Sequence, residues 1–228
     1  MPRVHGARPV VAFDLDGVLI DSAEANVQAF RFGLEQVGVE VRDPEAILSL
    51  VGYPATRMLV ELGCPEDQAG AVFNDFVRPF YIDNLPTLAR AYPGSQRVLE
   101  QLREAGFRVA ACTSGDRQTQ TSALQAIGLW ELIEEMQTPC DSEFGKPDVR
   151  YIGELLDRLG EYGDVHHVED SEVGLRMGRE FGATVYFASY GNGRLSGEVE
   201  PDFTLDNIEE LPQAILRAAS GQGAASLV

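Results

Sequence analysis

The chain has 228 residues and a formal net charge of −18, and 44% of its residues are hydrophobic, which is ordinary globular composition. It has no apolar run long enough to span a membrane and no apolar N-terminal stretch typical of a signal peptide. The negative charge disfavours a nucleic-acid partner and an anionic membrane surface. We therefore expect a cytoplasmic protein, a monomer or homodimer, with no nucleic-acid or membrane partner.

The first predicted elements are a buried strand and an amphipathic helix. Residues 10–13 form a short apolar run followed by acidic residues and Gly17, as expected for a parallel strand that leads into a loop. Asp21-Ser22 is a plausible helix cap. Apolar residues spaced four and three apart, from Ala23 to Val37, predict a helix that ends at Gly38.

The next segment predicts further short helices and no strand. Helices are expected to begin at Asp43-Pro44, Pro54 and Pro65, with Gly52 and Gly63 ending the first two. We therefore predict that residues 21–90 form an all-helical cap domain, with hinges near residues 20–22 and 85–92. Residues 1–20 and 91–228 would form the core domain.

From residue 92 onward, strand and helix patterns alternate. Strands are predicted at residues 107–112, 133–136, 165–169, 184–188 and 203–205, with helical patterns between them. This alternation predicts an α/β fold with a parallel, doubly wound, Rossmann-like sheet. Chemistry in such sheets lies at the carboxyl ends of the strands. We expect the tail, residues 220–228, to be disordered.

Two carboxylates, Asp14 and Asp16, follow the first predicted strand. Burying them there would be costly unless a cation or a proton neutralised them. One could attack phosphorus while the other acts as acid and base. Gly17 allows a tight turn whose N–H groups face anionic oxygens. The alternative, a pair of acidic turn caps, is disfavoured by the position at a strand end.

Four segments, in this order, resemble the haloacid dehalogenase superfamily over nearly the whole chain. They are residues 14–22, residues 109–113, Lys146 in the loop Gly-Lys-Pro, and residues 168–171. The resemblance implies a Rossmann-like core, a helical cap that closes over the site, and Mg²⁺ as cofactor. The members most similar in pattern are phosphoglycolate phosphatase and β-phosphoglucomutase-like proteins.

The resemblance also implies roles for individual residues. Asp14 would be the nucleophile that forms an aspartyl-phosphate, and Asp16 would protonate the leaving oxygen and then deprotonate water. Lys146, the one lysine in the chain, would neutralise the nucleophile and the phosphoryl oxygens. Mg²⁺ would bind the Asp14 carboxylate, the Asp16 backbone carbonyl and the Asp170 carboxylate.

Other positions complete the predicted site. Thr113, with the N–H groups of Ser114 and Gly115, would bind a phosphoryl oxygen. Glu169 replaces a glycine common in relatives, and it would be either a second acid beside the metal or a hydrogen-bonded carboxylate nearby. Arg57, in the predicted cap, is a candidate to contact the leaving group, although most arginines are simply exposed.

The function favoured by these residues is hydrolysis of a small phosphorylated metabolite by a phosphatase. Asp16 disfavours dehalogenation, which has no need of a second acid, and the absence of a cap lysine excludes phosphonate hydrolysis through a Schiff base. Two alternatives stay open: a sugar phosphomutase of the β-phosphoglucomutase type, and a catalytically idle binding protein on the same fold.

Overall fold

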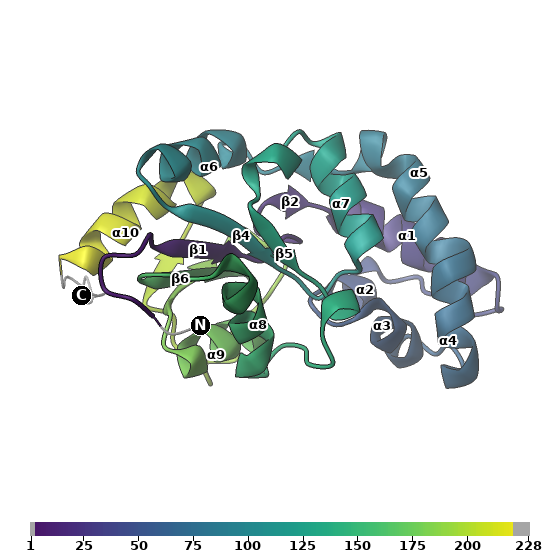
Figure 1. The fold of residues 1–228 in the computed structure, drawn as a ribbon. Helices are drawn as coiled ribbons and strands as arrows, with labels where there is room; N and C mark the ends of the chain where they lie inside the picture. Colours follow the sequence, from purple (N-terminus) through teal and green to yellow (C-terminus); the bar gives the residue numbers. More distant parts are fainter. Residues whose placement is uncertain (1–2, 221–228) are drawn as a thin grey trace.

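A parallel sheet forms the centre of the computed structural model, which describes residues 3–220 (Figure 1). Within these residues the sheet has six strands in the order β5-β4-β1-β6-β7-β8, and every pairing is parallel. The strands are β1 (Val10–Phe13), β4 (Arg108–Cys112), β5 (Glu135–Gln137), β6 (Val165–Glu169), β7 (Thr184–Ala188) and β8 (Phe203–Leu205). The predicted doubly wound α/β fold is confirmed.

Side chains of the central strands alternate between two hydrophobic cores, because successive residues of a strand point to opposite faces. Val11 and Phe13 of β1 pack in one core with helices α6 (Ser95–Glu104), α7 (Arg117–Ala126) and α10 (Leu211–Ala219). Val10 and Ala12 pack in the other, with α8 (Val149–Leu159) and Met177 of α9 (Glu172–Phe181). Helices therefore cover both faces of the sheet.

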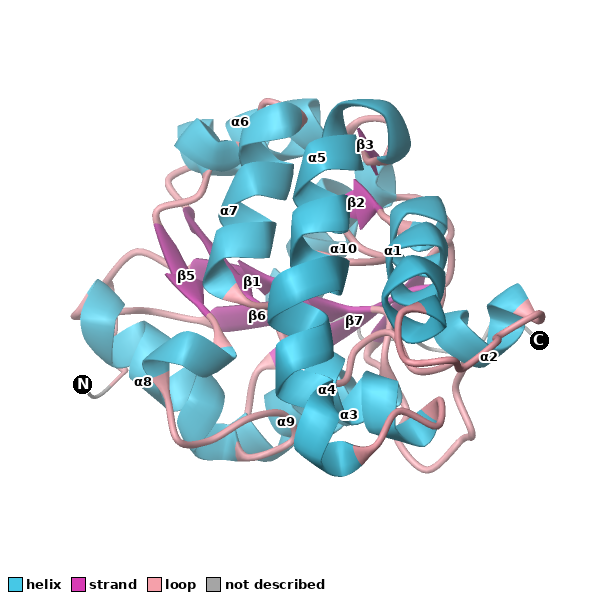
Figure 2. Ribbon diagram, turned by 90° about the vertical axis from the view of Figure 1, so that its right-hand side faces the viewer, coloured by secondary structure: helices cyan, strands magenta, loops and turns pink. Residues whose placement is uncertain are grey.

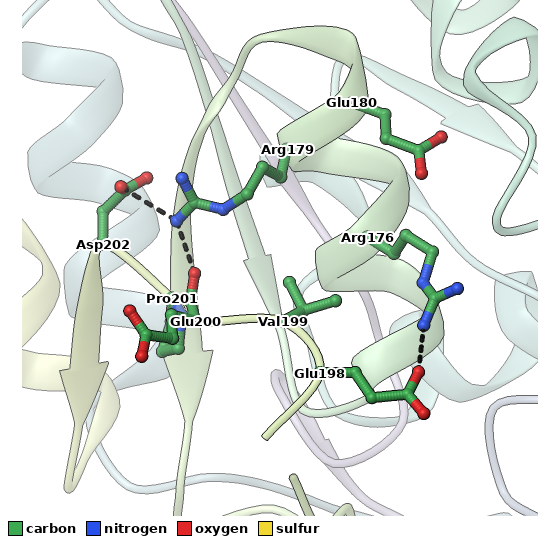
Figure 3. A pocket seen from close by; sticks show the side chains of 8 residues that line it. All are labelled: Arg176, Arg179, Glu180, Glu198, Val199, Glu200, Pro201 and Asp202. Carbon is green, nitrogen blue, oxygen red and sulfur yellow. Dashed lines mark hydrogen bonds and ion pairs between the residues drawn. The ribbon is translucent and has the colours of Figure 1, made fainter. Parts of the chain in front are cut away.

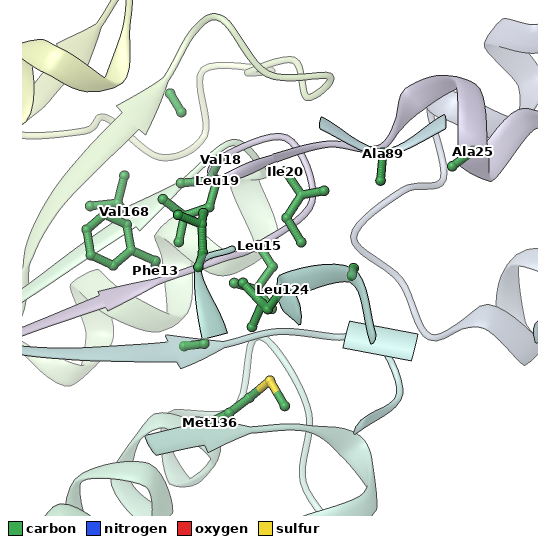
Figure 4. Close-up of a cluster of buried hydrophobic side chains, with 14 of the residues drawn as sticks. Phe13, Leu15, Val18, Leu19, Ile20, Ala25, Ala89, Leu124, Met136 and Val168 are labelled. Carbon is green, nitrogen blue, oxygen red and sulfur yellow. The ribbon is translucent and has the colours of Figure 1, made fainter. Parts of the chain in front are cut away.

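The loop after β1 is anchored by apolar side chains. Leu15, Leu19 and Ile20 are fully buried and belong to the same core cluster as Phe13 and Val168 (Figure 4). This packing fixes the segment that carries Asp14 and Asp16. A carboxylate next to such a core can stay in one orientation because its backbone neighbours are immobilised.

A group of helices lies beside the sheet, and we call these the cap helices (Figure 2). They are α1 (Ala23–Glu35), α2 (Pro44–Leu48), α3 (Ala55–Glu61), α4 (Glu66–Val72) and α5 (Arg78–Leu88). A π-helical turn, η1 (Phe73–Val77), joins α4 to α5, and short 3₁₀ turns occur at η2 (Trp130–Leu132), η3 (Pro139–Asp141) and η4 (Ile208–Glu210). The division into two domains remains our proposal.

The segments that enter and leave the cap helices are paired. Strand β2 (Ile20–Asp21) runs antiparallel to β3 (Arg90–Ala91). No local pattern predicts this short pair, which lies within the predicted hinges. No helix in the described part of the chain is long and apolar enough to cross a membrane. The tail expected to be disordered lies, after residue 220, outside the described residues.

Candidate active site

Three acidic side chains meet where β1 and β6 end. The register pairs Phe13 with Val168, so the next residues, Asp14 and Glu169, are neighbours, and Asp170 follows. Ligand atoms of these three carboxylates lie within 4.8 Å of one another, and all three side chains are buried. The sheet therefore concentrates negative charge in a small, dry volume.

Lys146, from the loop before α8, lies among these acids. Its Nζ is 3.0 Å from Asp14 Oδ1 and donates a hydrogen bond to Glu169 Oε1. Glu169 Oε2 accepts a hydrogen bond of 2.9 Å from the Ser171 hydroxyl. Burial would raise the pKa of Glu169, but Lys146 and then His167 outweigh it and lower this pKa to about 2. Glu169 is thus an ionised partner of the lysine.

Asp14 and Asp170 carry charge that the protein compensates poorly. Burial, and then the nearby Glu169 carboxylate, raise the pKa of Asp14 well above its usual value and the pKa of Asp170 to about 7. Asp170 Oδ2 accepts backbone N–H groups from Asn192 and Gly193, at 2.9 and 3.1 Å. One ammonium among three buried carboxylates leaves an excess of negative charge. This oxygen-rich donor set suits a hard divalent cation.

Two glycines make room for these acids. Gly17 has φ +79°, and a Cβ there would lie 2.0 Å from Asp170 Oδ2. A Cβ at Gly174, in α9, would lie 2.0 Å from the Glu169 carboxyl group. Glu169, which replaces a glycine common in relatives, therefore fits here because Gly174 in the adjacent helix has no side chain.

Asp16, the second acid, is held by two side chains from different parts of the chain. Ser22 donates a hydrogen bond to Oδ1, and Gln120 Nε2 donates to Oδ2 over 2.6 Å. Ser22 occupies the N-cap position of α1 as expected, but its side chain makes no capping hydrogen bond. Ser22, which was expected to cap the helix, instead orients the Asp16 carboxylate.

The segment after β4 lies across from Asp14. Thr113, Ser114 and Gly115 line the same cavity as Asp14 and Asp16. Thr113 is 1% exposed, its Oγ1 accepts the Gly115 N–H at 3.1 Å, and its carbonyl accepts a hydrogen bond of 2.6 Å from the buried Tyr151 hydroxyl. This hydroxyl residue and the following N–H groups are therefore fixed at the mouth of the acidic site.

The cavity itself lies between the sheet edge and the cap helices and encloses about 60 Å³. Its cap-side lining is Asn26, Phe30, Val51, Gly52, Tyr53, Ala55, Met58, Phe73 and Tyr81, and Asp116, Thr119 and Gln120 complete the core side. Arg57 is not among these residues. It is exposed, and its guanidinium lies 4.1 Å from the centre of the Tyr53 ring.

A larger depression, about 840 Å³, lies between α9 and residues 198–202 (Figure 3). Arg176 pairs there with Glu198, and Arg179 pairs with Asp202. None of the acidic-cluster residues lines it. Both arginines are already paired with acids, and the depression is open, so the smaller cavity is our candidate for the active site.

Sequence reasoning did not single out Gln120 or Tyr81. Gln120 looks like any polar residue of a helix, and Tyr81 follows a proline in a segment for which no helix was predicted. Both are buried, at 2% and 4% exposure, and both line the cavity. No local pattern could have identified them, because their role depends on packing between α5 and α7.

The fold and the site together define a class of hydrolase. Its features here are a parallel α/β core, acids at the ends of β1 and β6, a buried lysine and a helical insertion. The chain belongs to the haloacid dehalogenase-like hydrolase family, whose model matches residues 11–188.

Several known proteins are similar to it. A phosphoglycolate phosphatase of Mesorhizobium japonicum is 27% identical over 227 residues, covering 93% of this chain and 99% of that protein. The tyrosine-protein kinase PtkA of Mycobacterium tuberculosis is 31% identical over 169 residues, 71% of this chain and 57% of that protein. The crystal structure of a predicted phosphoglycolate phosphatase from Haemophilus somnus 129pt matches with a TM-score of 0.83 at 22% identity, covering 93% of this chain and 100% of that one. This structural likeness shows the shared fold.

Proposed function

We propose that the protein is a Mg²⁺-dependent phosphatase that hydrolyses a small phosphorylated metabolite through an aspartyl-phosphate on Asp14. The observation that carries this proposal is the meeting of Asp14, Lys146 and Asp170 in one buried cluster, with Asp16 across the adjoining cavity. Relatives named phosphoglycolate phosphatase support the same reaction class.

In the first half-reaction, the Asp14 carboxylate attacks phosphorus and the bond to the leaving oxygen breaks. Asp16 gives its proton to that oxygen, while Ser22 and Gln120 keep its carboxyl group in place. In the second half-reaction, Asp16 takes a proton from water, which attacks the phosphorus of the aspartyl-phosphate and releases Asp14.

Charge stabilisation falls to Lys146 and to the segment after β4. The ammonium, 3.0 Å from Asp14, reduces the repulsion between the nucleophile and an anionic phosphoryl group. Thr113 and the N–H groups of Ser114 and Gly115 would hold the phosphoryl oxygens. Glu169 keeps the ammonium in position.

The acidic cluster fits Mg²⁺, which would be held by the Asp14 and Asp170 carboxylates and the Asp16 carbonyl, with Glu169 as an acid beside it. Bound there, the ion would offset the negative charge of the phosphoryl group. The raised pKa values of Asp14 and Asp170 support a cation at this place.

An assay of inorganic phosphate release tests this proposal. The substrates are p-nitrophenyl phosphate and a panel of phosphomonoesters, each assayed with Mg²⁺ and with EDTA. Asp14→Asn should abolish release while its circular dichroism spectrum stays that of the wild type. Asp75→Asn changes an exposed cap acid in the same way and should retain activity. Undiminished turnover in Asp14→Asn would refute the mechanism.

A sugar phosphomutase remains the second candidate, because Glu169 precedes Asp170 as in β-phosphoglucomutase-like proteins. Conversion of β-glucose 1-phosphate in the presence of a bisphosphate primer would identify it. The cavity of about 60 Å³ favours a smaller substrate than a hexose phosphate.

A further inference from the structure

The cavity above Asp14 and Asp16 has walls without positive charge. Its cap side is mostly apolar, with Phe30, Met58 and Phe73 among the lining residues. None of the described residues that line the cavity is lysine, arginine or histidine. A leaving group that carried a carboxylate would be buried there without a cation, which is far more costly than burying a hydroxyl.

One cap arginine lies behind this wall, but its charge is already paired. The Arg78 guanidinium lies 4.7 Å from the centre of the Phe73 ring, and its Nε is 3.3 Å from Asp116 Oδ1, an ion pair that lacks hydrogen-bond geometry. Phe73 and Asp116 line the cavity, whereas Arg78 does not. A substrate carboxylate would have to compete with Asp116 for this guanidinium.

Two neutral polar groups in the wall are incompletely hydrogen-bonded. Gln120 Oε1 is buried and has no hydrogen-bond partner among the residues that the structure describes, and the buried Tyr81 hydroxyl has the Ser22 side chain beside it but makes no hydrogen bond of good geometry. Gln120 uses its other amide atom, Nε2, to bind Asp16. Buried polar atoms are normally hydrogen-bonded, so these two groups have hydrogen-bonding capacity to offer a small polar group in the cavity. A tyrosine hydroxyl can donate to, and an amide oxygen accept from, the same hydroxyl group.

We infer that this cavity selects a small phosphomonoester whose leaving group is uncharged and carries a hydroxyl, and that Tyr81 and Gln120 recognise that hydroxyl. The inference rests on the proposed phosphatase function and defines its substrate class. The cavity, about 60 Å³, is well below the ~300–1,000 Å³ of common ligand pockets, which favours a leaving group of a few heavy atoms. Tyr81 lies in α5 and Gln120 in α7, so one substrate hydroxyl would join a cap helix to the core.

Three esters with two-carbon leaving groups test the inference: 2-hydroxyethyl phosphate, ethyl phosphate and phosphoglycolate. They differ only at the second carbon, which is a hydroxymethyl group in the first ester, a methyl group in the second and a carboxylate in the third. With saturating Mg²⁺, we expect kcat/KM for 2-hydroxyethyl phosphate to exceed that for ethyl phosphate by about fivefold or more. We expect it to exceed that for phosphoglycolate by about tenfold or more.

Tyr81→Phe tests whether the tyrosine hydroxyl causes the preference for 2-hydroxyethyl phosphate over ethyl phosphate. It should lower the ratio of kcat/KM between 2-hydroxyethyl and ethyl phosphate at least about threefold. Tyr186→Phe removes another buried hydroxyl, which contacts His166 and does not line the cavity, and it should leave the ratio unchanged. Gln120→Leu is a second variant with the same expected loss, should Tyr81→Phe fold poorly.

Two results would overturn the inference in different ways. Hydrolysis of phosphoglycolate as fast as 2-hydroxyethyl phosphate would refute the substrate class but leave the phosphatase function intact, and loss of that activity in Arg78→Met would locate the carboxylate. No phosphate release from the three esters or from p-nitrophenyl phosphate would refute the function and the inference together.

Discussion

Lys146 offsets part of the negative charge of the acidic cluster. It is the single lysine of the chain, its side chain is 2% exposed, and it contacts both Asp14 and Glu169. Burial alone would lower its pKa, but Asp14 and Glu169 outweigh this effect and raise the pKa of Lys146, so it stays an ammonium.

Replacing Lys146 by arginine should therefore fail to preserve activity. The planar guanidinium is larger than an ammonium and cannot occupy the same enclosed position between two carboxylates. We expect kcat to fall by ~100-fold or more, as for the loss of a preorganised electrostatic donor. Arg42→Lys, the reverse change at an exposed site, should be neutral. Near wild-type kcat in Lys146→Arg would show that a point charge is not required.

His166 offers a residue-scale prediction about stability. Burial, only partly opposed by Asp164, lowers the pKa of His166 to about 4 from its usual 6.5. The unfolded chain therefore binds a proton below pH 6.5 that the folded chain does not bind until about pH 4. The stability that this histidine contributes is present above pH 6.5 and is lost as the pH falls toward 4.

His166→Phe should remove that pH dependence. Between pH 7 and pH 4.5, the stability of the wild type relative to the variant should fall by ~2 kcal/mol. Urea unfolding at a series of pH values measures this difference, and His5→Gln, at an exposed position, controls for the loss of a histidine. If the stability difference between wild type and variant stayed constant across this pH range, buried His166 would not have a lowered pKa.

At the level of helices and strands, Gly174 allows α9 to lie close to the Glu169 side chain of β6. Gly174→Ala would place a methyl group 2.0 Å from the Glu169 carboxyl, which is held by Lys146 and Ser171. Overpacking of this kind costs ~1–3 kcal/mol. We expect a lower melting temperature and reduced kcat, because displacement of Glu169 moves Lys146.

A second interior helix glycine provides the control. A Cβ at Gly153, in α8, would meet its nearest atom at 3.9 Å, an ordinary contact. Gly153→Ala should therefore raise stability by ~0.5–1 kcal/mol, the usual gain from alanine within a helix. Equal effects of the two substitutions in thermal unfolding would contradict the specific fit at Gly174.

At the scale of the whole molecule, a net charge of −18 repels the dianionic substrate that the site is proposed to bind. Salt screens this long-range repulsion but affects the buried contacts of the site much less. With saturating Mg²⁺, kcat/KM for a phosphomonoester dianion should rise ~2–5-fold between 10 and 150 mM ionic strength. The kcat/KM for O-phosphoethanolamine, whose ammonium offsets part of the phosphate charge, should rise less with ionic strength. A decrease in kcat/KM for the dianion with rising ionic strength would contradict this account.

Much of the core was predictable from local patterns. The bounds of β1, β6, β7 and β8 agree with those expected, since each is a short run rich in apolar residues. The meeting of Asp14 and Asp170 was also expected, because the carboxyl ends of parallel strands share one edge of the sheet. The place of Lys146 beside them was implied by the family resemblance.

The cap was predicted less well. Helix α5 was missed because prolines at positions 79 and 86 disfavour a helix, yet η1 continues α4 into it and Pro86 lies within it. The pair β2–β3 consists of two residues on each side, too few to leave an alternating pattern. In both cases contacts made by distant segments override weak local preferences.

The sequence alone therefore predicted a parallel α/β core with acids at the ends of its strands, because hydrophobic periodicity and the carboxylates that follow an apolar run are local features. The folded structure was needed to show that Glu169 pairs with Lys146, that Ser22 and Gln120 hold Asp16, and that no cation lines the described cavity wall. These facts depend on which side chains of separate elements come within contact distance. Such contacts are set by packing in three dimensions and leave no periodic trace in the chain.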